Sequence, residues 1–326
     1  MPHSSGGGGF CSTEKGMNTI KEIAVVLPAY NEALTIAETL EDFHANLPEG
    51  FLVVVDNNSS DDTARIARKT LDRLGAKGIV LTEPKQGKGF AVRRAFKTID
   101  ADIYIMSDAD FTYPAEQAGQ LIQCMNERNA DMVVGDRHSS GSYLQENTRR
   151  LHNFGNGLVT WLVNTLFGAE LNDIMSGLRV LTRRFVKNYP ILVNGFELET
   201  DMTLHALDKR MTIVEIPIEI RDRPEGSESK LKTVPDGARV LFVILQLLRY
   251  YRPMFFFGAT ALILFIAGLA AGTLPVLDYY FEGFVHHVPL AILATGLELS
   301  ALISLSIGLI LDSIGHSAKM QFEKDL

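Results

Sequence analysis

Two aspartates, Asp108 and Asp110, close an apolar run in the first half of the chain. Two carboxylates separated by one residue repel each other unless a cation lies between them. Their hard oxygen atoms suit Mg²⁺ or Mn²⁺, ions that usually bind one or two carboxylates together with the phosphates of a substrate. The pair therefore indicates a divalent-metal site, and a solvated turn with the same three-residue pattern is the alternative.

Other polar residues that could do chemistry follow apolar runs earlier in the chain. Asp56 closes the run at residues 51–55 and could accept an N–H group of a nucleobase, while residues 57–60 could simply cap the next helix. Lys85 and Lys88 flank glycines, which let a backbone approach a ligand closely, and both would suit phosphates. The chain has neither a Walker motif nor a G-x-G-x-x-G fingerprint here, which disfavours ATP or a nicotinamide cofactor.

The elements expected to position these residues alternate strand with helix. Strands are expected at residues 22–27, 51–55, 78–81, 103–106 and 131–134, and helices end near 47 or cover 63–74, 90–99 and 114–128. Such alternation predicts parallel strands in a doubly wound α/β sheet. The polar loops are 28–32, 56–62, 84–89 and 108–112. They should meet at one edge, where open α/β sheets bind ligands.

Composition places the chain among proteins with a membrane-bound part. Its 326 residues are 46% hydrophobic, and the apolar excess lies after residue 253. The net charge of −8 argues against nucleic acid as the main partner. Two cysteines, Cys11 and Cys124, make no disulfide framework and are expected to be reduced thiols. Residues 1–20, rich in Gly and Ser at their start, are expected to form a disordered tail.

Two long apolar stretches in the last quarter are each able to cross a membrane. Residues 254–277 carry no charge, and residues 289–311 carry only Glu298. Either stretch can span a hydrocarbon core of about 30 Å. Glu298 should face protein rather than lipid, because a charged side chain at mid-membrane is costly.

Basic residues around these stretches predict their orientation. Arg249 and Arg252 precede the first stretch and Lys319 and Lys324 follow the second, whereas the link 278–288 has no Lys or Arg. The positive-inside rule therefore puts both ends in the cytoplasm. The expected division is a tail (1–20), a catalytic domain (21–234), a juxtamembrane amphipathic helix (235–253) and a two-helix anchor with a short cytoplasmic tail (254–326).

Seven sequence motifs occur in an order that resembles a known family. They are VVLPAYNE (25–32), VVDNNSSDDT (54–63), KQGKGFAVRRAF (85–96), SDADFTYPAE (107–116), GDR (135–137), MSGLR (175–179) and RPEGSESKL (223–231). Together they resemble a family 2 glycosyltransferase of the dolichyl/polyprenyl-phosphate sugar synthase group over about residues 21–250. The resemblance implies a GT-A fold with a Rossmann-like, mostly parallel sheet, a nucleotide-sugar donor, a divalent metal and an inverting mechanism.

The resemblance also implies roles for particular residues on the donor side. Donor-binding residues would be Pro28, Tyr30, Glu32, Asp56, Lys88, Asp108, Arg223 and Lys230, the last two in a loop that could close as a lid. Asp108 and Asp110 would bind the metal and the diphosphate. Many such synthases have Gln where this chain has Thr112, which leaves the third metal ligand open.

Arginines after the donor half suit an anionic acceptor, because the planar guanidinium forks onto phosphate. A lipid phosphate is already ionised near neutral pH and needs cations rather than a general base. By resemblance the acceptor-binding residues would be Arg137, Arg149, Asn153 and Arg179, although Arg149 with Arg150 could be a solvated helix start. Glu199 would join Asp108, Asp110 and Arg137 in the catalytic centre, either as a base or as a ligand of sugar hydroxyls, and helix capping is its alternative.

The function expected from the sequence is inverting transfer of a sugar to a polyprenyl phosphate, of the undecaprenyl or dolichyl type, at the cytoplasmic membrane face. A UDP-sugar donor is favoured and a GDP-sugar is possible, and a homo-oligomer is left open. One alternative is transfer to a hydroxyl of a lipid-linked glycan. The other is a non-catalytic membrane scaffold that binds nucleotide-sugars.

Overall fold

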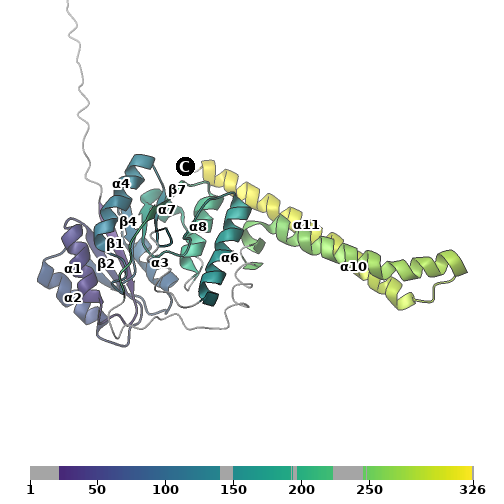
Figure 1. Cartoon of the computed structure of the whole chain (residues 1–326), viewed down its shortest axis with the longest axis horizontal. Coiled ribbons are helices and arrows are strands. Elements are labelled where there is room, and N and C mark those ends of the chain that lie inside the picture. Colours follow the sequence, from purple (N-terminus) through teal and green to yellow (C-terminus); the bar gives the residue numbers. More distant parts are fainter. Residues whose placement is uncertain are drawn as a thin grey trace, which may run out of the picture.

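The computed structural model describes residues 22–139, 150–191, 193, 197–222, 245–246 and 248–324. One seven-stranded sheet forms the centre of the part of the chain that precedes the two long C-terminal helices (Figure 1). Its strands are β1 (Ile23–Ala29), β2 (Phe51–Asp56), β3 (Gly78–Thr82), β4 (Ile103–Met106), β5 (Met132–Asp136), β6 (Arg179–Thr182) and β7 (Ile213–Pro217). In the order β3-β2-β1-β4-β6-β5-β7, only β6 runs antiparallel to its neighbours.

Helices cover both faces of this sheet. One face carries α1 (Ile36–Asn46), α2 (Thr63–Leu74) and α4 (Ala118–Arg128), which the short 3₁₀ helix η1 (Ala115–Gln117) precedes. The other carries α3 (Lys88–Thr98), α7 (Arg183–Asn188) and α8 (Leu198–Asp208). Strand β1 shows why the layers form: Ala24 and Val26 belong to one core and Val25 and Leu27 to the other, all fully buried. A parallel strand buried on both sides needs such a continuous apolar run.

The fold class expected from the sequence is confirmed. All five expected strands are present, and the expected helices are found with small differences at their ends. Helix α3 begins at Lys88, two residues earlier than expected, because Gly87 adopts a positive φ of 135° that starts the helix there. Strands β6 and β7 were not among the expected strands.

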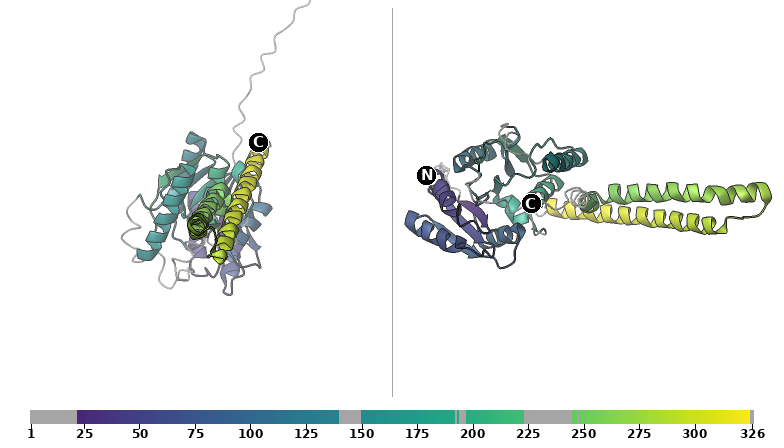
Figure 2. Two further views of the ribbon diagram at one scale, coloured as in Figure 1. Left: turned by 90° about the vertical axis from the view of Figure 1, so that its right-hand side faces the viewer. Right: turned by 60° about the horizontal axis from the view of Figure 1, so that its bottom comes forward.

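Two long helices extend from the part of the chain that contains the sheet and form an antiparallel hairpin, which Figure 2 shows from two further sides. They are α10 (Pro253–Glu282) and α11 (Val288–Lys324), and both are long and apolar enough to cross a membrane. Large apolar side chains such as Ile263, Ile266 and Ile303 are more than half exposed on their outer surface. Such a surface suits lipid rather than water.

Glu298 of α11 lies against Gly268 of α10. A Cβ atom at Gly268 would lie 2.5 Å from Oε1 of Glu298, so any larger residue here would require the Glu298 side chain to shift. The expectation that Glu298 faces protein is therefore met by the neighbouring helix. Most of the expected amphipathic helix, including residues 240–244, lies outside the described residues, and residues 245–246 and 248–251 are helical.

Candidate active site

The polar loops expected at one edge of the sheet do meet there. The backbone N–H of Asn31 donates to Ser59 Oγ (3.0 Å), and Ser60 N–H donates to Asn31 Oδ1 (2.8 Å). Asn57 joins the next loop, because its Nδ2 donates to Lys85 O (2.6 Å) and its Oδ1 accepts from Gly87 N–H (2.7 Å). Asn57 therefore ties two ligand loops together, a role that differs from the helix cap suggested by sequence.

Asp56 ends β2 at this edge, and one of its oxygen atoms has no partner among the described residues. Its residue is 7% exposed, and Oδ1 is buried without a hydrogen bond to any described residue. A buried acceptor without a donor costs free energy, so it marks a place where an incoming N–H group would be stabilised. Pro28, near the end of β1, and Tyr30, directly after this strand, are half-buried.

Glu32 connects the loop after β1 to the aspartate turn. The hydroxyl of Thr35 donates to Glu32 Oε2 (3.1 Å) and to the carbonyl of Ala109 (2.8 Å), which lies between the two aspartates. The N–H of Glu32 donates to Thr63 Oγ1 at the start of α2 (2.9 Å). Buried Glu32 and Thr35 together therefore fix the relative positions of these three segments.

The turn after β4 holds Asp108 and Asp110 in an unusual backbone conformation. Phe111 has a positive φ of 63°, which is uncommon for a bulky residue and concentrates at functional sites. The N–H of Thr112 donates to Asp110 Oδ1 (3.1 Å), and the Arg221 guanidinium stacks 4.6 Å from the centre of the Phe111 ring. Asp110 is 4% exposed, while Asp108 is more accessible.

Lys88 joins this turn to α8. Its Nζ atom lies 2.5 Å from Asp108 Oδ1 and also bonds Glu199 Oε1. Burial lowers the pKa of the Lys88 ammonium, but the two carboxylates outweigh burial and raise that pKa above its usual value. Lys88 is therefore charged, and the structure brings Asp108, Lys88 and Glu199 together as the sequence analysis expected of the donor and catalytic residues.

Gly177 allows a second loop to close on Asp108. A Cβ atom here would lie 2.7 Å from Asp108 Oδ2, and the Gly177 N–H donates to the Tyr113 hydroxyl (2.9 Å). The neighbouring Ser176 has a buried Oγ without a partner among the described residues. The Ser-Gly pair recognised in the sequence thus borders the aspartate turn.

Arg137 is held in place by an aspartate that sequence reasoning missed. Its Nε and Nη2 donate to the two oxygens of Asp173 at 2.7 and 2.8 Å, and Asp173 is 1% exposed. Burial raises the pKa of the Asp173 carboxyl, but the Arg137 fork outweighs it and holds this pKa below its ordinary value. Asp173 belongs to none of the recognised motifs and to no regular apolar pattern. The one feature that could have identified it is its position two residues before the MSGLR motif.

Arg179 lies beneath the site. It is fully buried, and its guanidinium donates to the carbonyls of Ser176 (3.0 Å) and Ile174 (2.6 Å) and to Thr203 Oγ1 (2.8 Å). These bonds hold the loop that carries Gly177 rather than presenting the guanidinium to a ligand. Arg149, Arg223 and Lys230 lie outside the described residues, as does the side chain of Asn153, whose backbone belongs to α6 (Arg150–Phe167).

The donor atoms at the turn fit a hard divalent ion. The described part of the chain contains no group of three or more His, Cys, Asp or Glu side chains placed to hold a metal. The turn offers a metal ion two carboxylates, those of Asp108 and Asp110. The hydroxyl oxygen of nearby Thr112 is buried without a partner among the described residues. Mg²⁺ is commonly held by one or two carboxylates plus phosphate oxygens and water, which is the set this turn could complete with a bound diphosphate.

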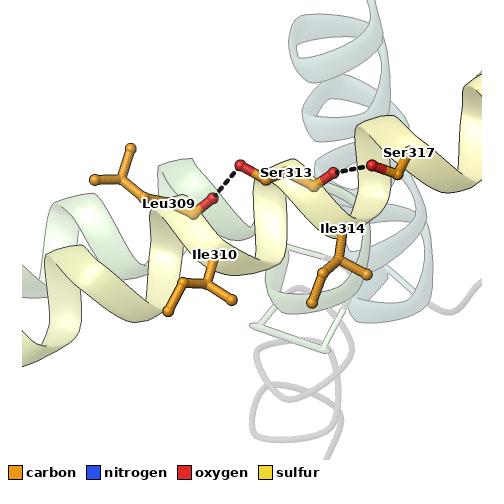
Figure 3. A pocket seen from close by; sticks show the side chains of 5 residues that line it. All are labelled: Leu309, Ile310, Ser313, Ile314 and Ser317. Carbon is orange, nitrogen blue, oxygen red and sulfur yellow. Dashed lines mark hydrogen bonds between the residues drawn. The ribbon is translucent and has the colours of Figure 1, made fainter.

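Two surface hollows lie away from this edge. One, of about 450 Å³, runs along α11 and is lined by Leu309, Ile310, Ser313, Ile314 and Ser317 (Figure 3). Its serine hydroxyls donate to carbonyls four residues earlier in the same helix and have no charge to offer a phosphate. The other, of about 720 Å³, lies between α3 and the segment after α7. Neither contains a residue expected at the site.

Comparison with known proteins defines the class. Residues 24–188, half of the chain, match the protein family "Glycosyl transferase family 2". The chain therefore belongs to that family. Glycosyltransferase AglJ of Haloferax volcanii is 28% identical over 83% of this chain and 87% of its own. The dolichyl-phosphate hexose transferase of the same organism is 31% identical over 68% of this chain and 92% of its own.

A solved structure shares the fold. Glucosyl-3-phosphoglycerate synthase from Mycobacterium tuberculosis, in complex with Mn²⁺, UDP-glucose and glycerol 3-phosphate, has a TM-score of 0.54 and 21% identity, covering 70% of this chain and 79% of that chain. The protein described here is therefore a glycosyltransferase with a GT-A-type fold and two apolar C-terminal helices.

Proposed function

We propose that this glycosyltransferase moves a sugar from a UDP-sugar to a polyprenyl phosphate, with inversion at the anomeric carbon. The observation that carries the proposal is the shared edge on which unpartnered Asp56 Oδ1 and the Lys88–Asp108 pair lie. One suits a nucleobase and the other a diphosphate, so together they suit a nucleotide-sugar.

On the donor side, Asp56 accepts the base N–H, and Pro28, Tyr30 and Glu32 form the nucleoside site. Asp108 and Asp110 would hold a Mg²⁺ or Mn²⁺ ion, which when bound would supply positive charge to the leaving diphosphate. Lys88 supplies a second positive charge there, and Arg223 and Lys230 complete the donor site. The solved relative with UDP-glucose and Mn²⁺ supports this choice of donor and ion.

On the acceptor side, the lipid phosphate attacks C1 of the sugar from the face opposite the leaving group. A C1–O bond to the lipid phosphate forms as the C1–O bond to the diphosphate breaks, and no proton has to be removed from the nucleophile. Arg137, Arg149 and Asn153 position the lipid phosphate, and Arg179 supports the loop that carries Gly177. Glu199 binds sugar hydroxyls. The 31% identical dolichyl-phosphate hexose transferase supports a polyprenyl phosphate as acceptor.

The hairpin anchors this site at the membrane, where a polyprenyl chain lies. We place both chain ends and the catalytic domain in the cytoplasm. The reason is that Lys and Arg residues lie before the first span and after the second, and none lies in the link between them. Single cysteines at positions 283 and 320, in a chain without Cys11 and Cys124, should react with a membrane-impermeant reagent from opposite sides of sealed vesicles. Reaction of both from one side contradicts two spans.

The test is a donor and acceptor panel with the full chain in detergent. Radiolabelled UDP-glucose, UDP-N-acetylglucosamine and GDP-mannose are each offered with undecaprenyl phosphate, dolichyl phosphate or undecaprenol, which lacks the phosphate. We expect label to enter an acid-labile lipid product with a phosphate acceptor and one UDP-sugar, and no label to enter undecaprenol. Label on a hydroxyl acceptor alone supports the glycan-extending alternative, and donor binding without transfer to any acceptor supports a scaffold.

A further inference from the structure

Helix α8 lies between the active site and the membrane hairpin, and it is buried around most of its circumference. Its first turn carries Glu199, which bonds Lys88 and through it Asp108. Thr203, one turn later, donates to the Glu199 carbonyl (3.0 Å) and accepts from buried Arg179 (2.8 Å). A shift of α8 would therefore move the side chains at the aspartate turn.

The start of the hairpin is fixed to the first turns of α8. Asp201 accepts hydrogen bonds from the hydroxyls of Tyr189 (2.7 Å) and Tyr251 (2.9 Å), and Tyr251 lies two residues before α10. Arg252 donates to Leu166 O at the end of α6 (2.6 Å). Asp201 and Tyr251 are both half-buried, and burial raises the pKa of each.

The C-terminal end of α11 lies back at the part of the chain that contains the sheet, as Figures 1 and 2 show. There it contacts the C-terminal end of α8. Lys319 Nζ lies 2.6 Å from Asp208 Oδ1, the last residue of α8. One turn further on, Phe322 packs against the core that includes Met202 and lies 5.1 Å from Lys209 Nζ. The segment that leads into α10 and the C-terminal end of α11 therefore contact the same eleven-residue helix, one toward its start and the other at its end.

We propose that the membrane hairpin is a positioning element of the active site, which holds α8 at both ends through Tyr251 and Lys319 and so sets the place of Glu199. Tyr251 and Lys319 act through α8 and touch no reacting atom. The physical reason is that displacement of a catalytic group by about 1 Å can cost on the order of 10²-fold in rate. The catalytic part of the proposal rests on the proposed function, whereas the mechanical part does not.

The test compares full-length Tyr251→Phe and Lys319→Ala with wild type in lipid nanodiscs. The matched control is Lys324→Ala, because Lys324 is an exposed lysine of the same helix, five residues beyond Lys319. Loss of one hydrogen bond or ion pair is expected to speed amide hydrogen exchange of residues 198–208 by roughly 2- to 13-fold. We expect kcat to fall by roughly threefold or more while KM for the nucleotide-sugar stays within about twofold. Lys324→Ala should match wild type in all three measurements.

Double mutants check that each residue acts through its partner. On an Asp208→Ala background, Lys319→Ala should add nothing further, and Tyr251→Phe should add nothing on an Asp201→Asn background. Unchanged α8 exchange in both single variants overturns the proposal, as does faster exchange with unchanged kcat. Exchange needs no turnover, so a wild-type protein that transfers no sugar contradicts the proposed function while the contact of the hairpin with α8 is still tested.

Discussion

The Nζ atom of Lys88 lies 2.5 Å from Oδ1 of Asp108, so an ammonium group of the chain itself rests on the first carboxylate of the aspartate turn. The same ammonium bonds Glu199, whose side chain is only 7% exposed. Carboxylates that repel in isolation are thereby partly balanced within the protein. A divalent ion at Asp108 has to share this carboxylate with Lys88, which makes the second aspartate the better place to test the metal.

Asp110→Asn removes one charge from the turn with little change in shape. We expect the fold to be kept and turnover to fall by roughly a hundredfold or more, since a charge-stabilising group is lost. Excess EDTA should suppress wild-type transfer to a similar degree, and added Mn²⁺ should restore it. Circular dichroism of the variant is the control for folding, and wild-type turnover that persists in EDTA contradicts the metal site.

Asp56→Asn should separate stability from binding. Because Asp56 Oδ1 is buried without a described partner, replacing the charged carboxylate should leave the melting temperature unchanged or raise it. Affinity for the nucleotide-sugar should fall by roughly 10- to 150-fold, the range for a hydrogen bond to a charged group. Calorimetry without lipid measures the affinity. A large loss of stability with unchanged affinity would show that Asp56 is structural.

Arg137 has to be tested together with Asp173. Arg137→Ala alone leaves a buried carboxylate without its fork, which costs about 3–5 kcal/mol and confuses folding with function. In the double variant Arg137→Met with Asp173→Asn, the buried charge is removed from both sides. We expect it to fold and to bind nucleotide-sugar normally, while kcat/KM for the lipid phosphate falls by roughly 10- to 150-fold. An equal loss of donor affinity would move Arg137 to the donor side.

His205 of α8 should make the protein less stable in mild acid. Burial and, to a smaller degree, the positive charge of the nearby Lys209 together lower the pKa of this imidazole from 6.5 to about 4. The folded state therefore keeps His205 neutral while the unfolded state takes up a proton below about pH 6.5. Stability should decrease as the pH falls from 6.5 to 4, by at most roughly 3 kcal/mol from this group.

The measurement is the unfolding temperature of the full chain at several pH values in that range. His205→Phe, whose ring suits the neighbouring Phe185 and Tyr189, should flatten the profile. His316→Gln is the control, because His316 is exposed on α11. Equal profiles for wild type and His205→Phe contradict the assignment.

The sequence predicted β1 to β5 because each of these strands is a short apolar run bounded by turn residues, but it missed β7, which runs parallel to β5. Strand β6 was not predicted because this short strand begins with Arg179. An arginine gives no sign of burial in a sequence, since the carbonyls of Ile174 and Ser176 that satisfy it come together only in the fold.

The residues of the candidate site also fall into those that local sequence patterns identify and those that they do not. Asp56, Lys88 and Asp108 could be found because each lies in a loop that follows a strand or opens a helix at one edge. Asp173 and Tyr251 could not, because their partners Arg137 and Asp201 are 36 and 50 residues away along the chain. Such pairs are set by tertiary packing, and no local spacing records them.

From the length of the hairpin we expect turnover to depend on the thickness of the bilayer around it. Helix α11 has 37 residues and continues without a break to the residues that contact α8. At 1.5 Å per residue it is about 55 Å long, well beyond a hydrocarbon core of about 30 Å. A thinner or thicker membrane changes the tilt of such a helix, and tilt displaces its cytoplasmic end. Turnover in vesicles of graded acyl-chain length should therefore pass through an optimum, so that lipid composition alone tunes sugar transfer.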